Sequence, residues 1–123
     1  MGYESRVFIV EDYGNGYASI IADLHLAVID NDLLDCLTIN AKPIDFKIYG
    51  DPDSVGDSID LTVDRYGKTC TYTTITEIKK ALTKLDDTYR RHNLLKAVIN
   101  QFSLDMANGL WTDKDLKVVH YGY

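Results

Sequence analysis

The sequence predicts an α+β domain: an antiparallel sheet of five to six strands with two helices packed on one face, in the order β-β-β-β-β-α-α-β. Three observations lead to this prediction. Apolar residues alternate with polar ones through much of residues 5–73, the period becomes helical after Thr74, and a short β-branched segment follows the helices. A chain of 123 residues removes about two-thirds of its unfolded surface from water on folding, which suffices for one core. We therefore expect residues 1–123 to form a single domain.

Residues 5–29 are expected to form a hairpin. The segment SRVFIV is β-branched and aromatic, and EDYGNG after it is typical of a turn because glycine and asparagine tolerate positive φ. Alternation in YASIIADLHLAVI favours a strand with five apolar residues on one face: Ile20, Ala22, Leu24, Leu26 and Val28. A helix is the alternative, because an overlapping set fits a spacing of about 3.6 residues: Tyr17, Ile20, Ile21, Leu24 and Val28.

Three further strands are expected before the helices. PIDFKIYG at residues 43–50 alternates, with Ile44, Phe46 and Ile48 facing inward, and SIDLTVD at 58–64 alternates in the same way. TCTYTTI at 69–75 is rich in residues that favour strands. DNDLLDCL at 30–37 is ambiguous, and it also fits a helical turn between strands.

Two helices and a last strand complete the predicted order. Thr74 and Glu77 have the spacing of a capping box, in which each side chain satisfies a backbone donor at a helix start. An apolar stripe follows it, made of Ile75, Ile78, Ala81, Leu82 and Leu85. A second helix begins after two aspartates, carries Leu95, Val98, Ile99 and Phe102 on one side, and ends at Asn108-Gly109. DLKVVHYGY is then the last strand.

Cysteine usage and hydropathy indicate a cytosolic protein. Cys36 and Cys70 form no CxxC pair, so we interpret them as small apolar fillers in a reducing compartment, with a nucleophile or a disulfide as alternatives. The N-terminus lacks the features of a signal peptide, and no window approaches eighteen apolar residues. We expect no membrane segment.

Charge is divided unequally between the two halves of the chain. Residues 1–64 hold thirteen acidic and three basic side chains, for a net charge of −10, whereas residues 65–123 hold six acidic and ten basic ones, for a net charge of +4. Such an asymmetry predicts an acidic surface and a mildly basic one.

Five aspartates are concentrated in the stretch YGDPDSVGDSIDLTVD. An EF-hand loop does not fit, because Val55 and Thr62 stand at ligand positions, so we reject that motif and predict no metal site, with an irregular calcium site as an alternative. On the strand at 58–64, Asp60 and Asp64 project away from the apolar side. The stretch thus predicts a partner-binding face that resembles a nucleic-acid backbone, made of Asp51, Asp53, Asp57, Asp60 and Asp64. The alternative is a charged strand face and loop that only keep the chain soluble.

A second candidate site is basic. Extending the stripe of Leu95 and Ile99 backward by one turn reaches Arg91 and His92, so these side chains are expected at the edge of the core. Arg90, Arg91 and Lys96 then form a candidate phosphate-binding site near a helix start. The alternative is that these residues snorkel or form salt bridges to the acidic half of the chain.

The histidines give no metal or catalytic signature. His25, His92 and His120 lie on separate elements without ligand spacing. A small enzyme that uses His25 or His120 is therefore the last alternative, because the sequence pairs neither with a nucleophile or base. We predict no catalytic residues and no cofactor.

The two ends of the chain carry a family resemblance. MGYESRVFIVE, YASIIADLHLA, YGK at 66–68, YRR at 89–91 and VVHYGY at the end resemble a family of small uncharacterised proteins of bacteriophages and prophages, mostly of Gram-positive hosts. The resemblance follows the whole length in order and departs from the family after YRR, where HNLLKAVI replaces a Pro-rich segment. It implies an early role in infection and assigns no activity.

The matching ends also have a physical interpretation. The first and last strands are expected to pair in the centre of the sheet, since paired strands constrain each other through cross-strand contacts. Glu4 and Arg6 share one side of the first strand, and we expect His120 to face them.

The leading functional hypothesis is a non-enzymatic phage accessory protein that binds and inhibits a host defence protein in the host cytoplasm. An anti-CRISPR or anti-restriction inhibitor fits, with a nucleic-acid-binding nuclease as partner and the acidic face as a DNA mimic; no direct nucleic-acid binding is expected. The alternative is a nucleotide- or phosphate-binding module that sequesters a signalling nucleotide. An exposed edge strand and nine tyrosines also make a homodimer an expectation.

Overall fold

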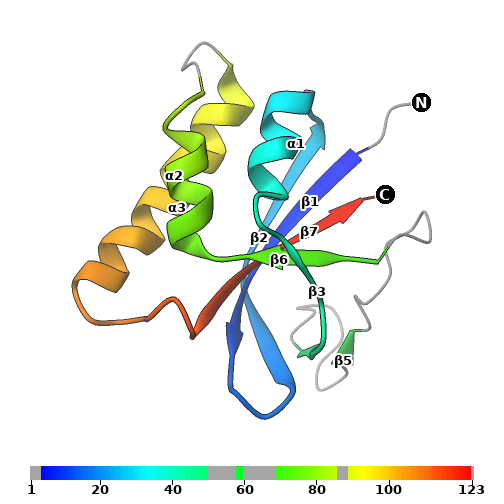
Figure 1. Ribbon diagram of the computed structural model, residues 1–123, viewed down its shortest axis with the longest axis vertical. Coiled ribbons are helices and arrows are strands. Elements are labelled where there is room, and N and C mark those ends of the chain that lie inside the picture. The colour runs from blue at the N-terminus through cyan, green and yellow to red at the C-terminus, as the bar shows by residue number, and fades with distance from the viewer. Residues whose placement is uncertain (1–3, 50–57, 60–68, 86–88, 123) are drawn as a thin grey trace.

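A computed structural model describes residues 4–49, 58–59, 69–85 and 89–122 of the chain. These residues form one sheet and three helices, so the predicted α+β class is confirmed (Figure 1). The elements in chain order are β1 Glu4–Asp12, β2 Tyr17–Val28, α1 Asn31–Leu37, β3 Lys42–Pro43, β4 Lys47–Tyr49, β5 Ser58–Ile59, β6 Thr71–Thr73, α2 Ile75–Leu82, α3 Arg90–Ala107 and β7 Leu116–Gly122.

The sheet is mixed, and its centre is formed by the two ends of the chain. The strand order is β3-β6-β7-β1-β2-β4-β5. β1 pairs antiparallel with both β2 and β7, which confirms that the first and last strands meet. The prediction of a wholly antiparallel sheet is wrong, because β4 pairs parallel to β2.

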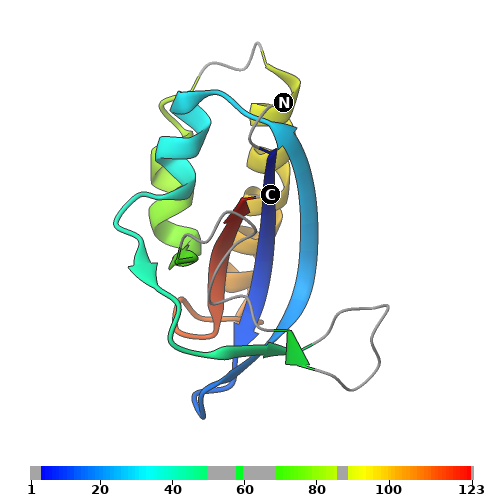
Figure 2. The same ribbon diagram turned by 90° about the vertical axis from the view of Figure 1, so that its right-hand side faces the viewer.

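The parallel pair arises because the chain crosses the sheet between β3 and β4. Only residues 44–46 connect these strands, although four others stand between them in the sheet order. An extended connection of this length spans about 14 Å, whereas five strand spacings in a flat sheet would take about 24 Å. The sheet must therefore curl until its edges approach, and Figure 2 shows the connection running across it. On this crossing, the Ile44 amide donates a hydrogen bond to the Cys70 carbonyl at 3.1 Å.

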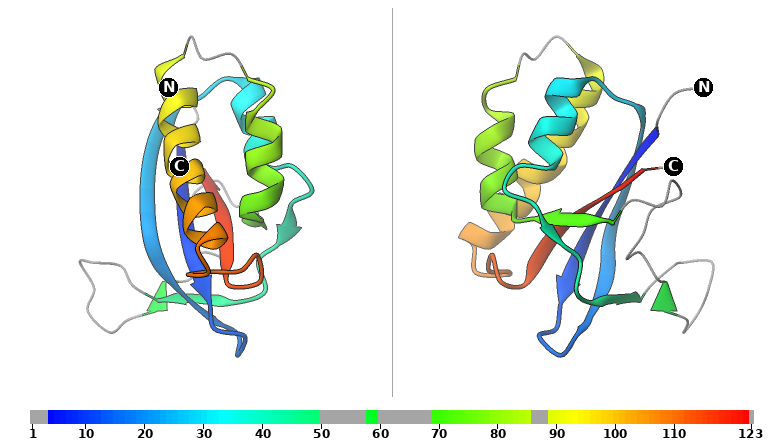
Figure 3. Two further views of the ribbon diagram at one scale, coloured as in Figure 1. Left: turned by 90° about the vertical axis from the view of Figure 1, so that its left-hand side faces the viewer. Right: turned by 45° about the vertical axis from the view of Figure 1, so that its right-hand side comes forward.

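The three helices cover one face of β1, β2 and β7 (Figure 3). The prediction of two helices on one face missed α1, which forms from the ambiguous segment at 30–37. α2 contacts both α1 and α3. The largest core lies between this helical layer and the sheet, and it includes Val7, Ile9, Leu24, Leu26, Leu33, Cys36, Leu37, Ile75, Ile78, Leu82, Leu95, Ile99, Leu116 and Val118.

A second core lies on the opposite face of the sheet, under the crossing segment. Ile44, Phe46 and Ile48 are buried there, as their alternation predicts, while Asp45 and Lys47 are exposed. The prediction of one strand at 43–50 is wrong, because residues 44–46 connect β3 to β4 and belong to neither. They pack with Phe8, Val10, Ala18, Cys70 and Val119. Cys70 thus belongs to a different core from Cys36, and both cysteines are buried and form no disulfide in the described part of the chain. The interpretation of the cysteines as apolar fillers is confirmed.

β2 changes faces along its length because it contains two bulges. One residue of β2 is skipped between the partners of Ser5 and Arg6 of β1, and a second is skipped between the partners of Ile9 and Val10. The second skip leaves Ile21 as an extra residue, so Ile20 packs in the second core while Ala22 packs in the first. The strand is confirmed, but the prediction that Ile20 and Ala22 share one face is wrong.

The helix ends follow their local sequence signals. The Thr74 hydroxyl accepts a hydrogen bond from the Glu77 amide at 3.2 Å, which confirms half of the capping box. The Glu77 carboxylate instead accepts from Asn40 at 2.9 Å. α3 ends in a Schellman motif, because the Leu110 amide bonds the Asp105 carbonyl and the Gly109 amide bonds the Met106 carbonyl, with Gly109 at φ +85°.

Candidate anion-binding cleft

A cleft opens where the end of β2 and the start of α1 meet the first turn of α3. Its volume is about 430 Å³, and its polar lining consists of His25, Asp30, Tyr89, Arg90, Arg91 and His92. Ile29, Leu33 and Leu94 supply apolar surface. Residues that are far apart in the sequence therefore line a single cleft.

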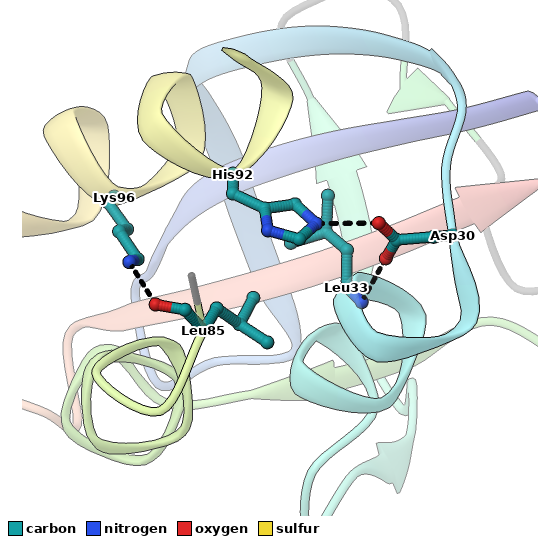
Figure 4. Close-up of polar contacts among 5 residues, drawn as sticks. All are labelled: Asp30, Leu33, Leu85, His92 and Lys96. Atoms are coloured by element: carbon teal, nitrogen blue, oxygen red, sulfur yellow. Dashed lines mark hydrogen bonds and ion pairs between the residues drawn. The ribbon is translucent and has the colours of Figure 1, made fainter. Parts of the chain in front are cut away.

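Asp30 is positioned as the N-cap of α1. Its backbone is extended, and its Oδ1 accepts a hydrogen bond from the Leu33 amide at 2.8 Å. Its Oδ2 lies 2.8 Å from Nε2 of His92 (Figure 4). The Leu33 amide, and secondarily His92, lower the pKa of the Asp30 carboxyl although partial burial opposes the shift. Asp30 is therefore an ionised acceptor at neutral pH.

His92 lies on the buried side of α3. Its side chain is 4% exposed, one turn before the core residue Leu95, which confirms that the apolar stripe extends backward to it. The Tyr89 ring packs against the imidazole with centroids 5.0 Å apart. The contact with Asp30 joins this basic segment to the acidic half of the chain, but through His92 and not through Arg90, Arg91 or Lys96.

Arg90 and Arg91 are exposed in the first turn of α3 and line the cleft. The prediction that Arg91 lies at the edge of the core is wrong, because its position turns toward solvent when His92 turns inward. The N-cap Tyr89 makes no side-chain capping bond, and the first turn contains no acidic residue. Two cations thus stand at the positive end of a helix dipole, an arrangement that an anionic ligand would stabilise.

Lys96, the third predicted phosphate ligand, does not join the cleft. Its Nζ donates to the Leu85 carbonyl at 2.7 Å, near the end of α2 (Figure 4). It lines a separate space of about 250 Å³ between α2 and α3, together with Lys79, Thr83 and Asn100. The structure therefore brings Arg90 and Arg91 together and assigns Lys96 to helix packing, since a lysine near a helix C-terminus bonds the last carbonyls.

The prediction that His120 faces Arg6 is also wrong. His120 lies on the helix-covered face, and its Nε2 is 2.9 Å from the Ser5 hydroxyl, which is buried. Arg6 points to the other face, where its Nε donates to Asp23 at 2.9 Å. Neighbouring residues on a strand alternate between faces, so His120 meets Ser5 rather than Arg6. The Glu4 side chain lies outside the described part of the chain.

The acidic-face hypothesis is not addressed by the structure, because Asp51, Asp53, Asp57, Asp60 and Asp64 all lie outside the described residues. Within the described ranges, no group of three or more His, Cys, Asp or Glu side chains is placed to hold a metal ion. None of the helices in these ranges is both long enough and apolar enough to cross a bilayer.

Sequence reasoning missed His25, Asp30 and Tyr89 as cleft residues. For Asp30 a local signal existed, because an aspartate directly before NDLLDCL fits the preference for Asp at N-cap positions. No local sequence signal predicted that residues 25, 30 and 92 line the same cleft, because this depends on how α3 packs across the end of β2.

No protein-family model matches the chain, and it has no significant similarity to a curated protein or to a solved structure. The function must therefore be inferred from the geometry of the cleft and from the charge pattern of the sequence.

Proposed function

We propose that the chain is a non-enzymatic bacteriophage accessory protein that sequesters a phosphate-bearing small molecule, of the kind of a signalling nucleotide, in the cleft at the start of α3. The observation that carries the proposal is the pair Arg90 and Arg91, both exposed beside the cleft at a helix N-terminus. The phage origin rests on the resemblance of the two chain ends, and action in the host cytoplasm follows from that origin.

The size and composition of the cleft support a small ligand. Small-molecule sites have volumes of about 300–1,000 Å³ and combine apolar surface with a few polar groups. The cleft, at about 430 Å³, has apolar surface from Ile29, Leu33 and Leu94 beside the two guanidinium groups. Guanidinium groups bind phosphate through paired hydrogen bonds, which makes arginine the preferred partner of a phosphate.

The buried position of Ser5 and His120 favours binding over catalysis. Ser5 and His120 form a serine–histidine hydrogen bond, but Ser5 is 0% exposed and both residues lie under the helical layer. A substrate bound in the cleft would not reach them. His92 does contact a carboxylate, that of Asp30, yet both groups serve to join α1 and α3.

Ligand-induced stabilisation tests the proposal. Inorganic phosphate, pyrophosphate and nucleoside monophosphates are titrated by calorimetry and by thermal unfolding. A ligand at 100 times its Kd should stabilise the native protein by about 2.7 kcal/mol. We expect the double variant Arg90→Ala/Arg91→Ala to lose this stabilisation while it remains folded, because both side chains are exposed.

The matched control removes the same charge elsewhere. Lys80→Ala/Lys84→Ala deletes two exposed cations from α2 and its C-terminal turn, outside the cleft. This variant should bind as the wild-type protein does. Equal loss of binding in both variants, or no binding by any phosphate compound, would overturn the proposal.

A second candidate function is inhibition of a basic host protein, such as a nuclease, by the acidic face. The division of charge, −10 in residues 1–64 against +4 in the remainder, favours it. Affinity capture from a host lysate supplies the partner, and Asp60→Lys/Asp64→Lys should then slow association at low ionic strength. Asp32→Lys/Asp35→Lys makes the same charge change on α1 and is the control. The expected homodimer is a separate question, which light scattering answers by measuring the molar mass of the protein in solution.

A further inference from the structure

Asp30 gives the cleft an acidic group in addition to its arginines. Its side chain is 44% exposed and lines the cleft together with Arg90 and Arg91. A ligand that is negative over its whole surface would meet repulsion from this carboxylate. A ligand that carries an anion at one end and hydrogen-bond donors at the other would satisfy both groups.

The carboxylate of Asp30 retains acceptor capacity for such donors. The Leu33 amide uses one acceptor site on Oδ1, and the His92 imidazole uses one on Oδ2. An ionised carboxylate has about four acceptor sites, two on each oxygen. The Asp32 amide also interacts with this carboxylate. About one acceptor site therefore remains, and the protein contacts hold the group in a fixed orientation.

Tyr89 adds an aromatic surface to the same cleft. Its side chain belongs to a residue that is 58% exposed, and its ring is supported by the buried imidazole of His92 at 5.0 Å between centroids. The two rings are tilted by 53°, and a largely exposed ring that such a contact holds in place is suited to stacking with a nucleobase.

We infer that the ligand is a nucleoside monophosphate whose base carries an exocyclic amino group, with guanine bound most tightly. This inference rests on the proposed function, since Arg90 and Arg91 hold the phosphate. Asp30 accepts hydrogen bonds from the base, and Tyr89 stacks on it. Guanine presents two adjacent donors, N1–H and the 2-amino group, so this edge brings a donor to the remaining acceptor site and no acceptor that the carboxylate would repel. Adenine and cytosine present a donor beside an acceptor, and uracil has no amino group.

Calorimetric titration with GMP, AMP, CMP, UMP and inorganic phosphate tests the inference. We expect GMP to bind the wild-type protein about tenfold or more tightly than UMP, as paired contacts to a base edge discriminate by that order. Asp30→Asn keeps a side chain that caps helices well. It should bring GMP to the affinity of UMP. Inorganic phosphate should bind no more weakly than it does to the wild-type protein, because the substitution removes the carboxylate charge that repels it.

The outcomes separate this inference from the proposed function. Equal binding of GMP and UMP by the wild-type protein overturns the inference, while arginine-dependent phosphate binding would still support the proposed function. A preference for GMP that survives Asp30→Asn also overturns it. Tyr89→Ala provides a second check: it should weaken all four nucleotides and leave inorganic phosphate unaffected.

Discussion

The carboxylate of Asp30 caps α1 through one oxygen and holds His92 of α3 through the other, with both contacts at 2.8 Å. One side chain thus joins the starts of two helices whose contacting residues are 62 positions apart. α1 has only seven residues, and a helix of that length is marginal by itself in water. Its stability therefore depends on this cap and on the burial of Leu33 and Leu37.

Replacement of Asp30 should separate the two roles of its carboxylate. Asp30→Ala removes the cap and the partner of His92, and we expect it to lower the free energy of unfolding by about 1–2 kcal/mol. Asp30→Asn keeps the capping oxygen and should cost less than half as much. Urea denaturation of the three proteins measures the difference. Equal losses in both variants would show that the cap contributes nothing.

The ionisation of Asp30 predicts a specific loss of stability in acid. Its folded pKa is lowered from the ordinary value of 3.8, chiefly by the Leu33 amide, so the unfolded chain binds this proton more tightly. The stabilisation is present above about pH 4 and is lost as the pH falls through the lowered folded pKa. We expect the stability of the wild-type protein to approach that of Asp30→Asn between pH 4 and pH 2. Parallel curves over this range would contradict the assignment.

Local patterns in the sequence predicted most elements of the fold, because strands and helices of this kind follow the period of their apolar residues. Ile44, Phe46 and Ile48 are buried as their alternation predicts, and Thr74 begins α2 as its hydroxyl predicts. The parallel pair and the bulge at Ile21 were not predictable in this way. Both depend on how far the sheet curls, which no short window of sequence specifies.

The residues of the candidate cleft were likewise predictable only where a local sequence pattern indicated them. Arg90 and Arg91 were identified from their position before an apolar stripe, which is a local feature. Lys96 was assigned to the same site because it lies one turn beyond His92, but its four-carbon stem reaches the Leu85 carbonyl instead. Asp30 and His25 required the packing of α3 against the end of β2.

Cys36 predicts a loss of stability in alkali. Burial raises the pKa of its thiol above the ordinary value of 9.0, and the carboxylates of Asp35 and Asp32 add to the shift. The folded state therefore holds the proton more tightly, so this contribution is complete below about pH 9 and is lost as the pH rises through the raised value. Unfolding free energies from pH 8 to pH 11 should fall less in Cys36→Ala than in the wild-type protein. An equal fall in both proteins would contradict the assignment of this loss to the Cys36 thiol.

Gly109 is expected to be required for the sharp end of α3. Its φ is +85°, and a Cβ built at this position would meet no atom within 4 Å. The cost of Gly109→Ala is therefore purely conformational, about 1 kcal/mol. Gly109→Asn should cost less, because asparagine tolerates left-handed backbone better than alanine. Thermal unfolding of both variants measures the difference, and an unchanged Tm in Gly109→Ala would refute the conformational argument.

The second core is expected to make a large contribution to stability, although a short crossing segment supplies much of it. Phe46 is 8% exposed, packs with Tyr72 at 5.6 Å between ring centroids, and lies in the three-residue connection that requires the sheet to curl. Truncation of a buried phenylalanine leaves a cavity and costs about 3–5 kcal/mol. We expect Phe46→Ala to lose stability in this range.

Lys47→Ala is the matched control for Phe46→Ala, because its side chain is exposed on the adjacent residue and should change stability by less than about 0.5 kcal/mol. Guanidinium denaturation distinguishes the two variants. Similar small losses in both would mean that residues 44–46 merely connect β3 to β4. A loss confined to Phe46→Ala would mean that the crossing segment holds the edges of the sheet together by burying this side chain against Tyr72.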